Sequence, residues 1–248
     1  MLRPWSDRRI NDCGERLYSL LPELLCLRPH PYQALGAPYG EGADPFVLRA
    51  GVRHRLVAAQ EDLMRRDPQL RFAIFDAWRP IAVQRFMVDY ALAEERARLG
   101  LPQVAAADDI KTQAALDAVE KAVGRFWAPP SHDPCTPPPH STGAAVDLTL
   151  ADEWGRPLDM GGAIDAIGAV SEPAYYAEAA LHGQNADAKL FHQRRSLLKA
   201  VLEAEGFCQH PNEWWHFSYG DQLWAWKTGQ EQAIYGRVDP TSDLGAGD

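Results

Sequence analysis

Cysteine is scarce in this sequence, and the few that occur do not form a metal-binding pattern. Cys13, Cys26, Cys135 and Cys208 include no CxxC pair, which disfavours a zinc knuckle built on thiolates. A disulfide framework is disfavoured too, because such frameworks belong mainly to short exported chains, whereas this chain has 248 residues and shows no export signal. We therefore expect ordinary reduced thiols.

Long apolar runs are also missing. No stretch reaches the about 18 consecutive apolar residues that a membrane-spanning helix needs. The apolar segment 17–27, LYSLLPELLCL, is interrupted by Pro22 and Glu23 and is not followed by a small-residue cleavage pattern, so it does not resemble a signal peptide. We expect a cytoplasmic protein without a membrane partner.

Basic charge is in deficit. The chain has 25 Lys and Arg against 34 Asp and Glu, a formal net charge of −9, which argues against a nucleic-acid partner because such proteins present basic patches. With 46% hydrophobic and 24% charged residues, the composition is that of a globular protein able to bury a sizeable core. The sequence leaves the oligomeric state open.

Apolar periodicity predicts the main elements of the fold. Helical spacing indicates helices over 52–67, 81–100, 111–127 and 185–207, the last ending at Gly206. Aromatic and alternating stretches indicate strands over 70–80, 143–152 and 213–220. The fold class that these elements predict is α+β, with a small, mostly antiparallel sheet packed against several helices.

A proline-rich segment interrupts this pattern. Residues 128–140, APPSHDPCTPPPH, contain six prolines in thirteen residues, a density that excludes a helix or a central strand because proline lacks an amide donor. We expect a stiff, extended connection within a single domain over 1–236, with a helical and proline-rich insertion around 92–139. Residues 237–248 have the composition of a disordered tail.

Three side chains form a candidate metal set: His140, Asp147 and His216. Two imidazoles and a carboxylate suit Zn²⁺, and three protein ligands leave a fourth position for water, the pattern of catalytic rather than structural zinc sites. Zinc lowers the pKa of such a water towards neutrality and makes it a usable nucleophile. The cofactor that we expect is one Zn²⁺ per chain.

The stretch NEWWHFSY, 212–219, places a glutamate three residues before His216, with two tryptophans between them. A hydrolytic zinc site needs a general base near its water, and Glu213 is the candidate, with the tryptophans as a rigid wall. Side chains at 213 and 216 would project to opposite faces of a regular strand. We therefore expect the strand to begin after Glu213, which would lie at the turn of Pro211 and Asn212.

Each of these residues also has an ordinary interpretation. A single histidine is more often hydrogen-bonded in a core, or exposed, than bound to a metal. Asp147 alone could cap a turn, and the tryptophan pair alone could be core. Arg79, in the stretch DAWRP, could form an ion pair with Asp76. Taken singly, the residues leave both interpretations open.

Taken together, the segments resemble a known family. PPHSTGAAVDLTL, 138–150, resembles the S-x-H-x-x-G-x-A-x-D segment of the D-alanyl-D-alanine dipeptidases, zinc peptidases related to bacterial D,D-carboxypeptidases and to the vancomycin-resistance dipeptidase. EWWHF matches the family's second signature, E-x-W-H. FDAWRP resembles a DGYRP-like segment, and MGGAID, 160–165, an MG-x-x-FD segment. The resemblance covers roughly 52–219 and implies the fold of these peptidases.

The resemblance also implies roles for the residues that match. His140, Asp147 and His216 would bind zinc, as the composition of the set already suggests. Glu213 would be the catalytic base, and Arg79 would stabilise the tetrahedral intermediate. That last role suits an arginine, which stays charged in a water-poor pocket and can face a developing oxyanion.

The implied substrate is a small D,D-dipeptide, hydrolysed to free D-alanine. Asp165 falls where the family has an acidic residue that binds the free amino terminus of the substrate. Tyr32 corresponds to a tyrosine near the start of the family, and Ser141 is a further candidate substrate-binding residue. The family's leading serine is Pro138 here, a departure that removes a hydroxyl from the substrate side.

Two other functions stay open. A carboxypeptidase or endopeptidase of the same fold could act on longer peptidoglycan peptides, although Asp165 argues against it. A binding module could keep the zinc without catalysis, as in the related Hedgehog signalling domain, but the presence of both Glu213 and Arg79 argues against that. The resemblance does not separate recovery of D-alanine from the lowering of dipeptide pools in antibiotic resistance.

Overall fold

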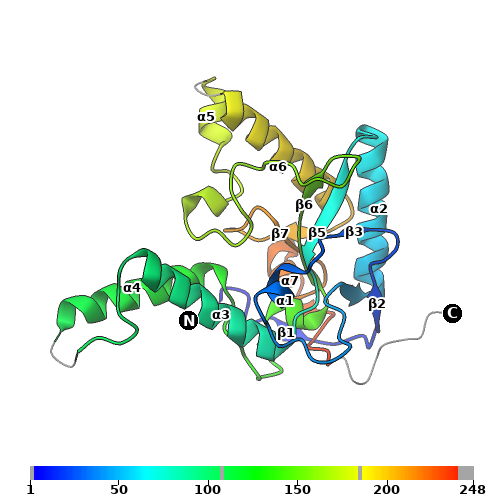
Figure 1. The fold of residues 1–248 in the computed structure, drawn as a ribbon. Helices are drawn as coiled ribbons and strands as arrows, with labels where there is room; N and C mark the ends of the chain where they lie inside the picture. The colour runs from blue at the N-terminus through cyan, green and yellow to red at the C-terminus, as the bar shows by residue number, and fades with distance from the viewer. Residues whose placement is uncertain (1–2, 107–108, 184–185, 240–248) are drawn as a thin grey trace.

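A computed structural model describes residues 3–106, 109–183 and 186–239 of the chain. A five-stranded sheet lies at its centre, with the strands in the order β3-β5-β6-β8-β7 (Figure 1). The strands are β3 (Leu25–Cys26), β5 (Arg71–Asp76), β6 (Ala145–Ala151), β8 (His216–Ser218) and β7 (Cys208–Gln209). The fold is α+β, as predicted.

The sheet is mixed rather than purely antiparallel. Three neighbouring pairs are antiparallel: β5 with β6, β6 with β8, and β8 with β7. The edge strand β3 pairs with β5 in parallel. A parallel neighbour requires a crossover connection, and here α1 (Pro31–Ala34), β4 (Val47–Arg49) and α2 (Ala50–Arg66) lie between the two strands. The sequence did not reveal β3, because two residues carry no alternation pattern.

Two further pairs of strands bring distant parts of the chain together. β2 (Leu17–Ser19) pairs antiparallel with β4, and β1 (Arg9–Ile10) pairs parallel with β9 (Gln232–Ala233). The second pair fixes the N-terminal segment beside the C-terminal part of the domain. Neither pair was predicted, since each depends on contacts between residues far apart in sequence.

Two long helices pack with the sheet around the main core. α2 and α6 (Ala186–Ala204) contribute Leu56 and Leu198, which are fully buried with Phe72 and Val146 of the sheet. α6 ends before Gly206, whose φ of 85° is the left-handed conformation that favours glycine at a helix end. Both helices match the predicted ranges closely; residue 185, the first of the second range, lies outside the described residues.

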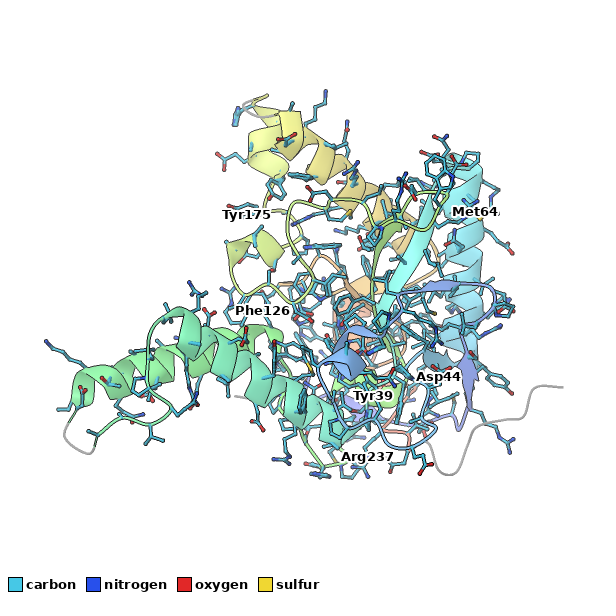
Figure 2. The ribbon with its side chains drawn as sticks, in the orientation of Figure 1. Tyr39, Asp44, Met64, Phe126, Tyr175 and Arg237 are labelled. Carbon is cyan, nitrogen blue, oxygen red and sulfur yellow. The ribbon has the colours of Figure 1, made fainter. Side chains whose placement is uncertain are left out.

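Two helices, which overlap the segment predicted as an insertion around 92–139, form a helical arm. α3 (Ile81–Arg98) and α4 (Ile110–Phe126) lie side by side and extend away from the sheet (Figure 1). Their apolar faces belong to a second buried cluster, which includes Val83, Met87, Val119 and Val123. Phe126 lies where the arm meets the body of the molecule (Figure 2).

The remaining short elements are η1 (Pro139–Thr142), η2 (Ala169–Ser171), α5 (Ala177–Leu181) and α7 (Gln222–Thr228). Among the described residues, no helix is long and apolar enough to cross a membrane.

The chain beyond Gly236 is not free of the fold. Val238 is buried, its N–H donates to the Ser141 carbonyl, and its own carbonyl accepts a hydrogen bond from Trp78 Nε1. Within the first part of the expected tail, Val238 is therefore packed against the domain. The rest of it, 240–248, lies outside the described residues.

Candidate metal centre

The three candidate metal ligands come from three neighbouring elements. Asp147 on β6 stands directly opposite His216 on β8 in the antiparallel ladder. His140 lies on η1, which immediately precedes β6. The chain leaves η1 through Gly143, whose φ is 68° and whose position would bring any Cβ into collision with Leu17. Only glycine fits this turn, and the turn carries His140 back to the other two residues.

The donor atoms of the set converge at tetrahedral spacing. His140 Nε2 lies 3.2 Å from His216 Nδ1 and 3.2 Å from Asp147 Oδ2, while His216 Nδ1 lies 3.0 Å from Asp147 Oδ1. Zinc bonds of about 2.0–2.1 Å at tetrahedral angles place neighbouring donor atoms roughly 3.3 Å apart. All three side chains are buried.

The hydrogen bonds of the two rings leave their inner nitrogens for a metal. His140 Nδ1 faces the Ala77 carbonyl at 2.7 Å, and a carbonyl can only accept, so the proton of the ring is on Nδ1. His216 Nε2 lies 3.2 Å from Ser218 Oγ. When the proton of His216 is on Nε2, with Ser218 Oγ as its acceptor, the lone pair on Nδ1 of His216 faces the lone pair on Nε2 of His140. Two lone pairs at this separation repel each other unless a cation lies between them.

Asp147 gives the same indication. Its Oδ1 is buried and has no hydrogen-bond partner among the described residues, although His216 Nδ1 is only 3.0 Å away. A buried carboxylate oxygen without a donor is costly. The donor set therefore fits a metal ion. The Ala77 carbonyl and Ser218 Oγ contact the ring nitrogens that point away from the centre and orient the two rings, as hydrogen-bond partners of histidine ligands do in metal sites.

Glu213 lies beside this centre and outside the strand, as predicted. The strand β8 starts at His216, and a turn covers Pro211 and Asn212. Glu213 Oε2 is 3.6 Å from His216 Nδ1, and Oε1 is 3.3 Å from His210 Nδ1. Burial, with the Asp147 carboxylate nearby, raises the pKa of Glu213 well above its ordinary value. The side chain is thus suited to accept and hold a proton.

Arg79 is fully engaged by neighbouring side chains. Its Nη2 lies 2.7 Å from Asp76 Oδ2 and 3.4 Å from Asp147 Oδ2, and Nη1 donates to Gln84 Oε1 at 2.8 Å. Burial acts to lower the pKa of Arg79, but Asp76 and its other neighbours raise it well above the ordinary value. The ion pair with Asp76 is real, and Arg79 also lines the cavity over the metal ligands.

Asp165, in the wall of that cavity, forms a hydrogen-bonded pair with Tyr32. Asp165 has a φ of 66°, unusual for a residue with a side chain, and accepts a 2.7 Å hydrogen bond from the Tyr32 hydroxyl at Oδ2. Burial and the nearby Asp147 raise the pKa of Asp165 to about 7. Asp165 lines this cavity and a second one, whereas Tyr32 lines only the second and contacts Asp165 from that side.

Ser141 is placed differently from the expectation. Its hydroxyl is buried and donates to the Arg79 carbonyl at 2.7 Å, and the residue is not among those that line the cavity. The donor is consumed within the fold, where it joins η1 to the segment that carries Arg79. This geometry does not support a contact between Ser141 and substrate.

The two tryptophans have separate roles. Trp215 lines the cavity, as expected of a rigid wall, and is otherwise buried. Trp214 packs in the main core, where the Arg195 guanidinium lies 5.1 Å from its ring centroid. Arg195 also donates to the carbonyls of Met160 and Val170, so it holds the loop that carries Asp165.

The cavity over the metal ligands has a volume of about 270 Å³. Besides the predicted residues, its walls include Arg3 and Trp5 from the N-terminal segment, Trp127 and Pro137 from the insertion, and His210. These wall residues could not be predicted from the sequence, since none belongs to a motif. Only the proximity of His210 to the E-x-W-H signature could have suggested it.

Two histidines and an aspartate converging on one point, beside a buried glutamate and over a small cavity, define the centre of a metal-dependent hydrolase. Comparison with known proteins identifies the family within this class of hydrolases. The family model described as D-ala-D-ala dipeptidase matches residues 26–234. The chain therefore belongs to this family of peptidases, which confirms the resemblance found in the sequence.

The chain is similar to two curated relatives and to one solved structure. The chain is 45% identical to a D-alanyl-D-alanine dipeptidase of Synechocystis over 247 residues, covering 96% of this chain and 98% of the relative. It is 40% identical to a D-alanyl-D-alanine dipeptidase of Escherichia coli over 78 residues, 32% of this chain and 36% of the relative. A zinc complex of a variant of the vancomycin-resistance D,D-pentapeptidase VanY is similar at a TM-score of 0.42 and 15% identity, covering 77% of this chain and 83% of that one.

Proposed function

We propose that the protein hydrolyses the D-alanyl-D-alanine dipeptide to two molecules of free D-alanine, with one zinc ion per chain. The observation that carries the proposal is the convergence of His140 Nε2, His216 Nδ1 and the Asp147 carboxylate on one point, with Glu213 beside them. Membership of the dipeptidase family and the near full-length relative supply the substrate class.

His140 Nε2, Asp147 and His216 Nδ1 would hold the zinc. When bound there, zinc supplies a Lewis acid for the peptide carbonyl and lowers the pKa of water. Within the described residues, this is the one group of three potential ligands close enough to share an ion, which supports a single zinc per chain.

Glu213 would move the proton. It takes a proton from the attacking water as oxygen bonds to the carbonyl carbon, and delivers it to the nitrogen as the peptide C–N bond breaks. Its burial supports this role, since a carboxylate in such surroundings gains by accepting a proton.

Arg79 would face the carbonyl oxygen as negative charge develops on it. The contacts with Asp76 and Gln84 hold the guanidinium in one orientation before substrate arrives. Such preorganisation is what makes an oxyanion partner effective, because no reorientation is needed during the reaction.

Asp165 would bind the ammonium group of the substrate, with Tyr32 holding its carboxyl from behind. The size of the cavity supports a short substrate. At about 270 Å³, it lies just below the ~300–1,000 Å³ range of sites for drug-sized ligands, and a dipeptide is smaller than those ligands.

The inserted segment around 92–139 would be part of the same catalytic domain. Its last part contributes Phe126 to Pro129, Ser131 and Thr136 to Pro139 to the cavity wall, which supports a role in shaping the substrate site rather than a separate function.

The test is the release of D-alanine from D-Ala-D-Ala by zinc-loaded protein. Glu213→Gln should lower kcat by about 10²–10⁴-fold while the zinc content, measured by mass spectrometry, stays the same. Glu153→Gln, at an exposed position, is the matched control and should leave kcat unchanged. A peptidoglycan pentapeptide cleaved faster than the dipeptide would instead assign the site to a carboxypeptidase.

A further inference from the structure

The N-terminal segment forms part of the wall of the active-site cavity. Arg3, Trp5 and Ser6 line it together with the metal ligands and Glu213. Two contacts hold the segment there: Arg3 Nη1 donates to the Arg125 carbonyl at 2.9 Å, and the Trp5 ring meets the His210 ring edge-on, with centroids 5.5 Å apart.

Arg3 brings a positive charge to this wall without a partner of opposite sign. No carboxylate of the described residues lies within ion-pair distance of it, and its Nε is buried without a hydrogen-bond acceptor. Burial lowers the pKa of Arg3 while Glu213 raises it. An arginine stays protonated in proteins, so the cavity wall holds a half-buried cation with donor capacity to spare.

The other cation of the cavity already has carboxylate partners, and in the proposed function it faces the carbonyl oxygen of the scissile bond. Arg79 is compensated by Asp76 and Asp147 and is also bonded to Gln84. A free anionic group entering the cavity therefore finds its unmatched partner in Arg3. A cationic group entering the cavity finds its partner in the carboxylate of Asp165. A zwitterion carries both charges, and a dipeptide is a zwitterion.

We propose that Arg3 binds the C-terminal carboxylate of the peptide substrate; this inference rests on the proposed function and names the group that recognises the second end of the dipeptide. Arg3 would bind the carboxylate end of the substrate and Asp165 its ammonium end. Together they restrict cleavage to a substrate with one peptide bond between these two groups. Arg3 is thus a specificity-determining residue supplied by the N-terminal segment.

A purely electrostatic effect of Arg3 on Glu213 is the competing explanation, and the chemistry of the substrate separates the two. D-Alanyl-D-alanine amide keeps the scissile bond and the ammonium group but lacks the carboxylate. If Arg3 binds the carboxylate, Arg3→Gln should lower kcat/KM for D-Ala-D-Ala by about ten- to a hundredfold, the range of a hydrogen bond to a charged group, mainly through KM. The same variant should leave kcat/KM for the amide within about twofold.

Arg9→Gln is the matched control, because Arg9 is exposed on β1 of the same segment and lies outside the cavity wall. It should behave as wild type on both peptides. Equal losses on dipeptide and amide would overturn the inference in favour of an effect on Glu213, and no loss on either would overturn it outright.

A binding measurement keeps the inference separate from the proposed function. Calorimetry with Glu213→Gln and with the double variant Arg3→Gln/Glu213→Gln, both zinc-loaded, compares the affinity for D-Ala-D-Ala without turnover. A ten- to hundredfold weaker Kd in the double variant supports carboxylate recognition whether or not the wild type cleaves the dipeptide. Equal affinities overturn it even if the wild type is an efficient dipeptidase.

Discussion

Asp147 Oδ1 and His216 Nδ1 lie 3.0 Å apart at directly opposed positions of two antiparallel strands. The register of β6 and β8 therefore sets the geometry of the metal centre. A slip of one residue would turn either side chain to the other face of the sheet. Because the sheet is built into the main core, the two candidate ligands are held in place without a metal.

Removal of one ligand should abolish stable zinc binding. His216→Ala leaves only two of the three donor atoms, so the zinc content after dialysis should fall from about one per chain to a small fraction. Zinc should raise the melting temperature of the wild type, since it binds the folded state, and should not raise that of the variant. His54→Ala, exposed on α2, is the control. Full zinc content in His216→Ala would contradict the ligand assignment.

Arg79 should matter for both stability and turnover. Arg79→Ala leaves Asp76 buried without its main cation, and the free energy of unfolding should fall by about 3–5 kcal/mol, measured by urea denaturation. Arg79→Lys keeps the charge but loses the paired contacts to Asp76 and Gln84. Its kcat should drop by about 10²-fold. Arg85→Lys, exposed on α3, should match the wild type in both assays, and a fully active Arg79→Ala would exclude the oxyanion role.

Asp76 should make the metal-free protein sensitive to acid. Burial alone acts to raise the pKa of Asp76, but Arg79, His30 and His140 outweigh it and lower the pKa to about 2. The folded state thus holds this proton less tightly than the unfolded state. The resulting stabilisation, about 2 kcal/mol, is present above pH 4 and is lost as the pH falls towards 2.

The measurement is urea unfolding between pH 6 and 2.5 with a chelator present, so that loss of zinc does not contribute. Asp76→Asn should be less stable near neutrality and should show a shallower decline with falling pH. A variant that declines as steeply as the wild type would show that other carboxylates control the acid sensitivity.

The sequence predicted those parts of the molecule that local pattern encodes. The helices α2, α3, α4 and α6 follow from apolar spacing, and β6 from alternation. The start of β8 after Glu213 follows from the two-residue period of a strand, which cannot place 213 and 216 on one face. The site residues came from motifs whose order along the chain is the only long-range information that a single sequence carries.

What the sequence did not reveal depends on contacts between distant segments. β3 joins the sheet in parallel with only two residues, and Arg3 reaches the cavity because β1 pairs with β9. Ser141 shows the converse relation, since its place within a motif suggested a substrate contact while its hydroxyl donates to the Arg79 carbonyl in the fold. A motif identifies residues that lie near the site, but packing decides which way each side chain points.

Recognition of the substrate ammonium should depend on pH through Asp165. Its pKa is raised to about 7 by burial and by Asp147, so the carboxyl loses its charge as the pH falls through 7. KM for D-Ala-D-Ala should rise progressively below that pH. Asp165→Asn should raise KM at pH 8 by about tenfold or more and remove this part of the pH dependence, whereas Asp89→Asn, exposed on α3, should change neither.

Tyr32 provides the sharpest test of that assignment, because it touches Asp165 without lining the main cavity. Its hydroxyl donates to Asp165 Oδ2 at 2.7 Å, and this hydrogen bond lowers the pKa of Asp165 against the effect of burial. Tyr32→Phe removes the donor and keeps the ring, so the pKa of Asp165 should move further above 7. The rise of KM should then begin at a higher pH than in the wild type.

A merely structural role for Tyr32 would give a different profile. Loss of packing would lower kcat/KM by the same factor at every pH and leave the position of the rise unchanged. KM profiles between pH 6 and 9 for wild type and Tyr32→Phe therefore decide between the two, with Tyr18→Phe, an exposed tyrosine on β2, as the control. Superimposable profiles would show that the hydroxyl does not govern the charge of Asp165, and the ammonium site would then have to be sought elsewhere in the cavity.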